Sequence, residues 1–458
     1  MGDPEFQVSG GAGGTGARYE DIGVLAAHSD DLARDLAGAS VQGHGVLVDP
    51  DLLASAVLNP DGFAKIEAGL LSALDGPDGL SALSLGFGER AIALRTVVAS
   101  YQAVDEAQAR AIDTLRWAAG YGLGGALQTG VLAPGLALPL VAPIGVAGAV
   151  FGDDVDWEQL LTEHPGIVDN LVGLGPGLIS SLPGTPMVAD VPGAADLLGQ
   201  LYEDGTHQTV ERGVDDSHDS MRFPPRDFAD LIDGLDWRNR EANAGQPDQI
   251  DVRVITNPDG SRAYVVDIPG TKEWNHPFQG DSPYLHDTGT NIHVLGGDTT
   301  TRQHAIADAL RMAGATTDDP VMLVGHSQGG MVAAQAAHDT STGAFPYNVT
   351  HVVTAGSPIG AVDVPPNVQV LSLENGHDLV PHLDARDNPD QANRTTVTFD
   401  SQLGSVGANH NTREAYLPAA QALDRSSDPS VQAYRDSAGA FLGGESVESK
   451  VYELNRIH

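Results

Sequence analysis

A short segment bounded by glycines places one serine where it can act as a nucleophile. Residues 325–329 read Gly-His-Ser-Gln-Gly, with Ser327 at the centre. An apolar run, 321–324, precedes the segment, and a run of mostly small residues, 330–337, follows it. A buried strand, a sharp turn and a closely packed helix lift a serine hydroxyl above the edge of a sheet. Because glycines two residues away leave room for that strained turn, the pattern predicts a nucleophile elbow.

A serine nucleophile needs a base, and the base must be oriented by a carboxylate. In this architecture the acid and then the histidine follow the serine along the chain. Asp378 lies in the loop after a predicted strand at 368–373, and His410 lies in the loop after a predicted strand at 395–399. These positions predict Asp378 as the acid and His410 as the base.

Other residues near these loops are alternatives for the same roles. Asp384 is the main alternative acid. His377 and His382 flank the predicted acid so closely that they do not normally reach across it to the serine. His326 precedes the serine on the same turn, so we expect a packing or substrate-facing neighbour rather than a base.

The oxyanion of an acyl-transfer intermediate needs two backbone donors. One comes from the residue after the nucleophile, here Gln328, and the other from the loop after an earlier strand. The predicted strand at 263–268 ends in such a loop, where Thr271 offers an amide and a hydroxyl and Gly270 is the next candidate. Water then releases the acyl group, so the chemistry needs no metal and no organic cofactor.

The elements that must position these residues predict an α/β-hydrolase fold, a mostly parallel sheet flanked by helices, in residues 249–458. Two strands, 250–255 and 263–268, are expected to pair around an Asn-Pro-Asp-Gly turn. The remaining expected elements are strands at 351–355, 368–373 and 395–399 and helices at 301–313, 412–424 and 431–441.

The first 117 residues predict a helical module, because apolar residues recur there at intervals of three and four. The residues expected on one helical face are Ile22, Leu25, Leu32 and Leu36; Phe63, Ile66, Leu70 and Leu74; and Leu94, Val97, Tyr101, Val104, Ala111 and Leu115. Residues 118–248 are expected to form an apolar Gly/Pro-rich helical hairpin, a cap and a linker. The uncharged stretch 118–152 is interrupted by prolines, so a buried hairpin is expected, with a lipid-contacting hairpin as the alternative.

Composition excludes several classes of protein. A formal charge of −38 argues against nucleic-acid binding and against electrostatic docking on anionic lipid. The chain has no cysteine, which excludes disulfides, thiolate metal sites and a thiol nucleophile. No basic segment followed by an apolar one marks an ordinary signal peptide, and residues 1–6 read as an expression remnant.

Four motifs in order resemble the fungal-type (class 3) lipases. They are Pro269-Gly270-Thr271, the elbow, Gly356-Ser357-Pro358 and Asp378-Leu379-Val380-Pro381. The resemblance implies Ser327, Asp378 and His410 as a triad and fatty-acid esters as substrates. The sequence therefore predicts a serine carboxylester hydrolase, similar to a lipase or phospholipase. An acyltransferase with the same triad, or a secreted interaction protein with a non-catalytic hydrolase fold, are the alternatives.

The helical module also resembles substrates of type VII secretion in high-GC Gram-positive bacteria. Tyr101-Gln102-Ala103-Val104-Asp105 matches their Tyr-x-x-x-Asp/Glu signal, with the two side chains on one helical face. The resemblance implies a secretion partner that contacts the N-terminal helices and a secreted or cell-envelope location.

Overall fold

The fold was established from a computed structural model of the chain. The structure describes residues 6–128, 157–242, 244–276 and 282–457. The chain divides into two compact units, one formed by Met1–Thr15 with Ile112–His458 and the other by Gly16–Ala111. The sequence suggested boundaries near residues 117 and 248. In the structure the described residues between those positions belong to the same unit as the sheet.

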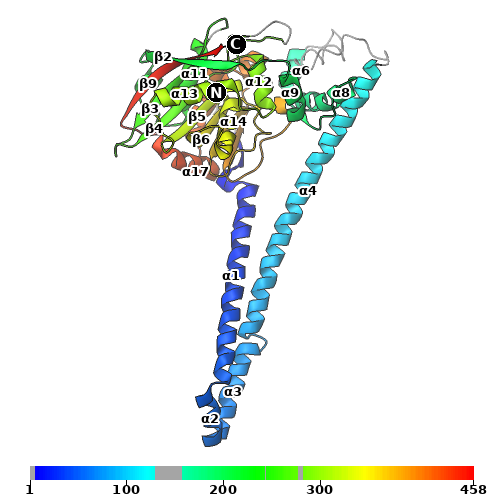
Figure 1. Cartoon of the computed structure of the whole chain (residues 1–458), viewed down its shortest axis with the longest axis vertical. Coiled ribbons are helices and arrows are strands. Elements are labelled where there is room, and N and C mark those ends of the chain that lie inside the picture. The colour runs from blue at the N-terminus through cyan, green and yellow to red at the C-terminus, as the bar shows by residue number, and fades with distance from the viewer. Residues whose placement is uncertain (1–5, 129–156, 243, 277–281, 458) are drawn as a thin grey trace. The chain divides into compact units, whose positions relative to one another are not determined.

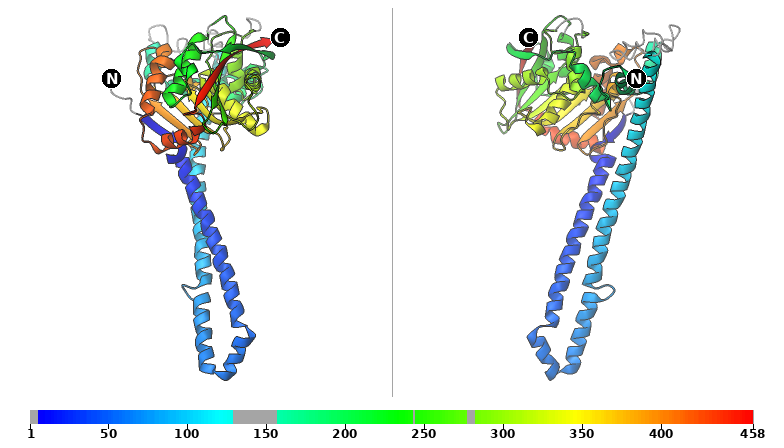
Figure 2. Two further views of the ribbon diagram at one scale, coloured as in Figure 1. Left: turned by 90° about the vertical axis from the view of Figure 1, so that its left-hand side faces the viewer. Right: turned by 45° about the vertical axis from the view of Figure 1, so that its right-hand side comes forward.

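The larger unit, which we call the sheet unit, is built on one sheet whose strand order is β1-β8-β7-β6-β5-β4-β3-β9-β2. The strands are β1 (Phe6–Gly10), β2 (Thr206–Val214), β3 (Asp248–Thr256), β4 (Arg262–Ile268), β5 (Pro320–His326), β6 (Asn348–Ala355), β7 (Gln369–Asn375), β8 (Arg394–Phe399) and β9 (Ser446–Ile457). Strands β4 to β8 are parallel, and the remaining pairings are antiparallel. Figures 1 and 2 show this sheet with helices packed against it. The expected α/β architecture is confirmed.

The strands predicted from the sequence are all present, and the hairpin of β3 and β4 pairs as expected. Three strands were not predicted, namely β1 and β2 at the two edges of the sheet and β9, which lies between β2 and β3. Phe6 pairs with Phe399 in the first of these, so this residue of the supposed expression remnant belongs to the sheet. Edge strands are half-exposed and therefore lack the continuous apolar run that identified the central strands.

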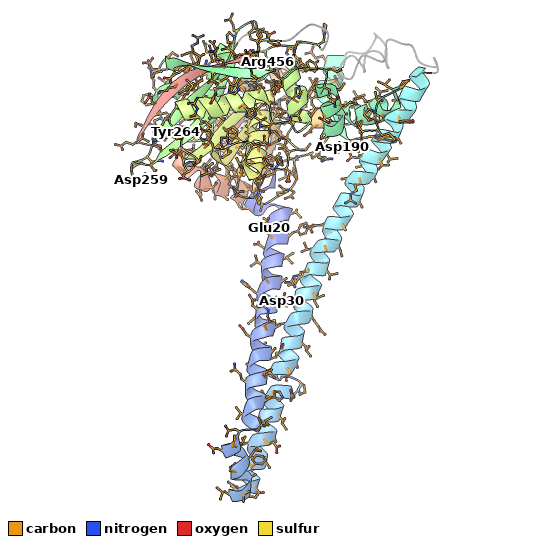
Figure 3. All side chains as sticks on the ribbon, viewed as in Figure 1. Glu20, Asp30, Asp190, Asp259, Tyr264 and Arg456 are labelled. Carbon is orange, nitrogen blue, oxygen red and sulfur yellow. The ribbon has the colours of Figure 1, made fainter. Side chains whose placement is uncertain are left out.

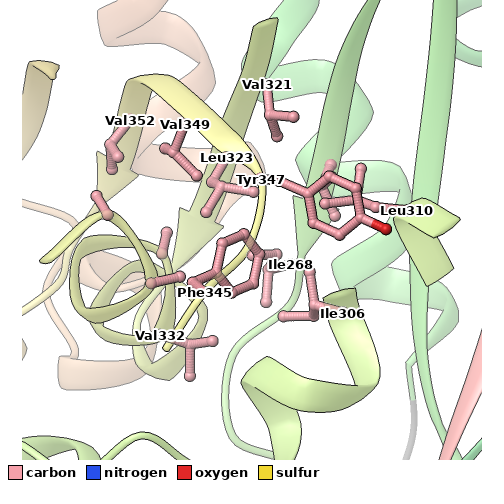
Figure 4. Close-up of a cluster of buried hydrophobic side chains, with 14 of the residues drawn as sticks. Ile268, Ile306, Leu310, Val321, Leu323, Val332, Phe345, Tyr347, Val349 and Val352 are labelled. Atoms are coloured by element: carbon pink, nitrogen blue, oxygen red, sulfur yellow. The ribbon is translucent and has the colours of Figure 1, made fainter. Parts of the chain in front are cut away.

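Helices cover both faces of the sheet. One face packs against α12 (Thr288–Leu295), α13 (Thr301–Met312) and α14 (Gln328–Thr342), and the other against α11 (Phe228–Glu241), α16 (Leu417–Leu423) and α17 (Pro429–Ser437). Successive β5 residues alternate between the two layers. Val321 and Leu323 lie in the first core, as Figure 4 shows, whereas Met322 and Val324 lie in the second. This double burial explains why residues 321–324 of β5 are apolar without interruption.

Short helices occupy the region before the sheet and the loops at its edge. They are α6 (Trp157–Glu163), α7 (Gly166–Gly173), α8 (Gly175–Ser181), α9 (Val191–Gly199), α10 (Asp219–Arg222) and α15 (Val406–Asn409), with 3₁₀-helices η1 (Gly11–Gly13), η4 (Val380–Asp384) and η6 (Ala438–Ala440) and a π-helical turn η5 (Thr412–Tyr416). Most of the predicted apolar hairpin at 118–152 lies outside the described residues. Among the helices of the described part, none is both long and apolar enough to cross a membrane.

The second unit, Gly16–Ala111, is helical as predicted. It contains most of α1 (Thr15–Leu47), all of α2 (Pro50–Leu58) and α3 (Pro60–Asp75), and the first part of α4 (Leu80–Gln128). Ser40 bonds Ser81, and Asp30, labelled in Figure 3, pairs with Arg95, so α1 and α4 run antiparallel.

The helical faces expected to be apolar and buried are only partly covered in this unit. Ile22 and Leu36 are half-buried, but Leu25 and Leu32 are exposed. Tyr101 of the secretion-like motif is also exposed, whereas the side chain of Asp105 lies outside the described residues. The expected resemblance to secretion substrates therefore stays a prediction.

Candidate active site

Ser327 occupies the turn between β5 and α14 in a strained backbone conformation, with φ of 55° and ψ of −123°. Non-glycine residues with positive φ are uncommon, and they concentrate at functional sites. Its neighbours leave no room for side chains. A Cβ atom on Gly325 would lie 2.3 Å from the backbone of Gly329, and one on Gly329 would lie 2.0 Å from the carbonyl oxygen of Ile268. The local geometry is therefore that of the expected elbow.

The predicted acid and base are in direct contact. His410 Nδ1 lies 2.7 Å from Asp378 Oδ2. Asp378 is fully buried, and its other carboxylate oxygen accepts a hydrogen bond of 3.0 Å from the backbone N–H of Val380. Because the carboxylate accepts the Nδ1 proton, Nε2 of His410 is the nitrogen that carries the free lone pair.

The end of β6, at Ala355 and Gly356, lies between the elbow and the pair formed by Asp378 and His410. The backbone N–H of Ser327 donates to the carbonyl of Ala355, the residue before Gly356. A Cβ atom on Gly356, whose φ is +60°, would lie 2.7 Å from Asp378 Oδ2 and 3.0 Å from His410 Nδ1. Gly356 belongs to the Gly-Ser-Pro motif, and its missing side chain is what allows the acid and base to lie beside the end of β6.

His326 packs against the predicted base rather than serving as one. Its ring centroid lies 4.3 Å from that of His410, and its Nε2–H donates to the His410 carbonyl over 2.8 Å. Burial, followed by the charge of His410, holds the pKa of His326 well below its usual range. A neutral His326 therefore supports the loop of His410, in agreement with its expected role as a packing neighbour.

Ser327 Oγ forms no hydrogen bond with any residue that the structure describes, and the same holds for His410 Nε2. Hydrogen bonds between a nucleophile and its base are often long before substrate binds and shorten in the substrate complex. The candidate acid and base thus contact each other, and no hydrogen bond joins His410 to Ser327 among the described residues.

The oxyanion candidates also meet at the elbow. A Cβ atom on Gly270 would lie 2.9 Å from Ser327 Cβ, so the turn after β4 touches the nucleophile. The Gly270 N–H already donates to Asn239 Oδ1 over 3.2 Å. In contrast, the backbone N–H groups of Thr271 and Gln328 have no partner within the described part of the chain. Thr271 is therefore a better-placed donor than Gly270.

The alternative residues lie in other contacts. The two carboxylate oxygens of Asp384 accept backbone N–H groups of Ala361 and Arg386. His382 pairs with Asp169 of α7 at 2.9 Å. His377 pairs with Asp400 and contacts the carbonyl of Thr162. Of the carboxylates considered, the structure brings only Asp378 to His410.

Sequence reasoning missed Tyr416, whose hydroxyl donates to Asp378 Oδ2 over 2.5 Å. Burial and the adjacent Asp378 raise the pKa of Tyr416 well above its usual range, so the hydroxyl keeps its proton. Tyr416 lies six residues after His410, at the end of η5, and no spacing rule identifies it. The only available signal was an aromatic residue at the start of a predicted helix.

A small and mostly apolar cavity of about 170 Å³ lies beside α14. Its wall includes Met331, Val294, Leu295, Pro358 and Val362. Met331 is one helical turn beyond Ser327, and its N–H donates to the Ser327 carbonyl. Pro358 ends the Gly-Ser-Pro motif, so the cavity adjoins two segments of the candidate site.

Residues 286–430 match the family model of the PGAP1-like alpha/beta domain. No curated protein and no solved structure matches the chain. The matched residues contain Ser327, Asp378 and His410, but they begin after the turn with Gly270 and Thr271. The match assigns an α/β-hydrolase domain to this part of the chain, and the activity that it indicates is that of a hydrolase of the esterase or lipase type. It supports neither a particular lipase class nor the likeness to secretion substrates.

Proposed function

We propose that the protein is a serine carboxylester hydrolase in which Ser327 attacks the acyl carbonyl. The observation that carries this proposal is the strained Ser327 at the end of β5, beside a buried Asp378 bonded to His410 Nδ1. Such an arrangement generates a nucleophile from a serine that is unreactive at its free pKa.

The reaction has two halves. His410 Nε2 takes the proton of Ser327 Oγ as this oxygen bonds to the acyl carbon, and the N–H groups of Gln328 and Thr271 stabilise the oxyanion. The intermediate collapses, the ester C–O bond breaks, and the alcohol leaves with the proton from His410. Water then attacks the acyl-enzyme by the reverse route and releases the acid. Asp378 holds the imidazolium throughout.

Hydrolysis of p-nitrophenyl esters tests this proposal. We expect the wild-type protein to release p-nitrophenol and Ser327→Ala to lose at least about 10³-fold in kcat/KM. A fluorophosphonate probe should label the wild-type protein at Ser327, as located by peptide mass spectrometry. Absence of both hydrolysis and labelling in the wild type contradicts the proposal, as does labelling at a different serine.

We further propose that the substrate is a lipid-like ester whose apolar part enters the cavity beside α14. The cavity lies one turn beyond the nucleophile and is lined mainly by apolar side chains. Apolar walls with few polar groups are typical of sites for apolar ligands. The class 3 lipase motifs support the same substrate class.

A cavity-filling substitution tests the location of that site. Leu295→Trp should shift the acyl-chain optimum of the ester panel toward shorter chains while Ser327 remains reactive to the fluorophosphonate. Val214→Trp, at an exposed position of β2, is the control for an added tryptophan. An unchanged chain-length profile in Leu295→Trp places the apolar group of the substrate elsewhere.

A further inference from the structure

Arg302, the second residue of α13, carries a charged side chain that is fully buried. A buried charge is costly unless an opposite charge and hydrogen bonds compensate for it. Asp248 at the start of β3 supplies the opposite charge, since its two carboxylate oxygens accept from Arg302 Nε and Nη2 over 2.8 and 3.0 Å. Burial alone would raise the pKa of Asp248, but Arg302 and His286 lower it to about 2. Asp248 is therefore ionised beside the guanidinium.

The same guanidinium also contacts the two segments that carry the candidate oxyanion donors. Nη1 donates to Gln328 Oε1 over 2.7 Å, and Nη2 donates to the carbonyl of Pro269 over 3.1 Å. Gln328 follows the nucleophile and contributes the first free amide. Pro269 begins the turn that contributes the second, at Thr271. One planar side chain thus bonds to both halves of the oxyanion site.

The two groups that Arg302 bonds, the Gln328 side chain and the Pro269 carbonyl, also make contacts with other residues. The Gln328 side chain is buried, and its Nε2 donates to the carbonyl of Asp287 over 2.6 Å. Gly329 lies against the end of β4, where a Cβ atom would come within 2.8 Å of the Pro269 carbonyl. The two donor segments therefore touch, and their spacing depends on side chains that bond both of them.

We propose that Arg302 is a positioning residue that sets the spacing of the Gln328 and Thr271 amides in the oxyanion site. This inference rests on the proposed ester hydrolysis. An ion pair that served only to stabilise the fold would need Asp248 alone. Arg253 of β3 gives the contrast, because it is equally buried and bonds Asp267 of β4, but neither Gln328 nor Pro269. Oxyanion donors act in the transition state, so a loss of spacing lowers kcat rather than substrate binding.

Three variants of the full chain test this role. Arg302→Lys keeps a positive charge for Asp248 but cannot donate in the planar fork that reaches both Gln328 and Pro269. Gln328→Met keeps the backbone amide and similar volume, removes the bond to Arg302, and leaves the Arg302–Asp248 pair intact. Arg253→Lys alters a buried ion pair that does not bond either donor segment.

Each variant is compared with wild type for kcat, for KM on a p-nitrophenyl ester, and for the affinity of an alkylboronic acid, which forms a tetrahedral adduct with a reactive serine. We expect kcat of Arg302→Lys and Gln328→Met to fall by about 10- to 100-fold, with KM within about twofold and a parallel loss of boronate affinity. Arg253→Lys should keep kcat even if its thermal stability falls.

The outcomes separate this inference from the proposed function. Wild-type protein that neither hydrolyses esters nor is labelled at Ser327 overturns both. Active wild type together with unchanged kcat in Arg302→Lys and Gln328→Met overturns the positioning role alone. An equal loss of kcat in Arg253→Lys also overturns it, because the effect would then belong to any buried arginine–aspartate pair of the sheet unit. If Arg302→Lys does not fold, Gln328→Met decides the question.

Discussion

Two of the protein's histidine–aspartate pairs have nearly the same nitrogen–oxygen distance and very different surroundings. His410 Nδ1 lies 2.7 Å from Asp378 in the sheet unit, and His44 Nε2 lies 2.8 Å from Asp75 in the helical unit. Asp378 is fully buried beside the end of β6, whereas the Asp75 side chain is 49% exposed. The short distance is common to both, so the surroundings, and not the pair itself, identify a candidate site.

The same contrast runs through the hydrophobic residues of the two units. Every residue from Val321 to Val324 in β5 is fully buried, because helices cover both faces of the sheet. In the described part of the helical unit, the buried apolar side chains are Ala26, Leu74 and Ala91. Two antiparallel helices share only one line of contact, so apolar residues away from that line stay exposed. An apolar helical face therefore does not by itself predict a core.

The largest expected effect compares the two histidine–aspartate pairs directly. Asp378→Asn should lower kcat for ester hydrolysis by about 10³- to 10⁴-fold, because the amide no longer holds His410 in the tautomer that accepts the serine proton. Asp75→Asn should leave kcat unchanged. Steady-state kinetics on one p-nitrophenyl ester check both. Comparable kcat in Asp378→Asn and wild type contradicts the assignment of the acid.

The next effect compares two leucines that differ in burial. Leu323→Ala removes a fully buried side chain of β5 and should cost about 2–5 kcal/mol in the free energy of unfolding. Leu85→Ala changes a side chain that is 70% exposed on α4 and should cost less than about 0.5 kcal/mol.

Denaturant titrations can follow the two units separately. The described part of Gly16–Ala111 contains no tryptophan, so fluorescence reports on the sheet unit, and circular dichroism adds the helical signal. A large loss of stability in Leu85→Ala detected by circular dichroism contradicts the exposed position that the structure gives this side chain.

The sequence predicted the central sheet well because its signals are local. The apolar β5 run, the turn between β3 and β4 and the glycines around Ser327 each depend on a few neighbouring residues. The proposed acid and base followed from chain order, since the ends of adjacent parallel strands lie together. The structure then placed Asp378 against His410, whereas the sequence had left Asp384 as the main alternative acid.

Features that depend on distant contacts were not predictable in this way. Tyr416 reaches Asp378 only because η5 returns to the end of β7, and Arg302 reaches Gln328 and Pro269 from a separate helix. The edge strand β1 forms by pairing with β8, almost the full length of the chain away. No hydrophobic period and no sequence motif marks the residues that make these contacts, so a single sequence does not predict them.

Helix glycines give a smaller contrast between the units. A Cβ atom on Gly86 of α4 would meet no neighbouring side chain within 4 Å, so Gly86→Ala should stabilise the helical unit by about 1 kcal/mol. A Cβ atom on Gly330 of α14 would lie 2.1 Å from Ser357 Oγ, so Gly330→Ala should destabilise the sheet unit by about 1–3 kcal/mol. Thermal unfolding measured by circular dichroism shows whether each substitution raises or lowers the stability. If both substitutions stabilise the protein, or both destabilise it, the inferred difference in packing around Gly86 and Gly330 is wrong.

The smallest effect concerns another histidine–aspartate pair of the sheet unit, His382 with Asp169, compared again with His44 and Asp75. Burial alone would lower the pKa of His382, but the hydrogen bond and charge of Asp169 raise it above 6.5. A backbone hydrogen bond to Ser40, followed by the bond to Asp75, raises the pKa of His44. A raised pKa in the folded state stabilises the fold below pH 6.5, and this stabilisation is lost as pH rises through the folded-state value.

We therefore expect Asp169→Asn to lower the midpoint of thermal unfolding more at pH 5.5 than at pH 8.5. Asp75→Asn should show the same sign with a smaller difference, since both side chains of its pair are more exposed to solvent that screens the charges. A destabilisation by Asp169→Asn that is larger at pH 8.5 reverses the expected sign. It would mean that His382 is neutral in the folded protein and that α7 is held to the loop of Asp378 by the apolar contacts of Val168 with Leu379 rather than by charge.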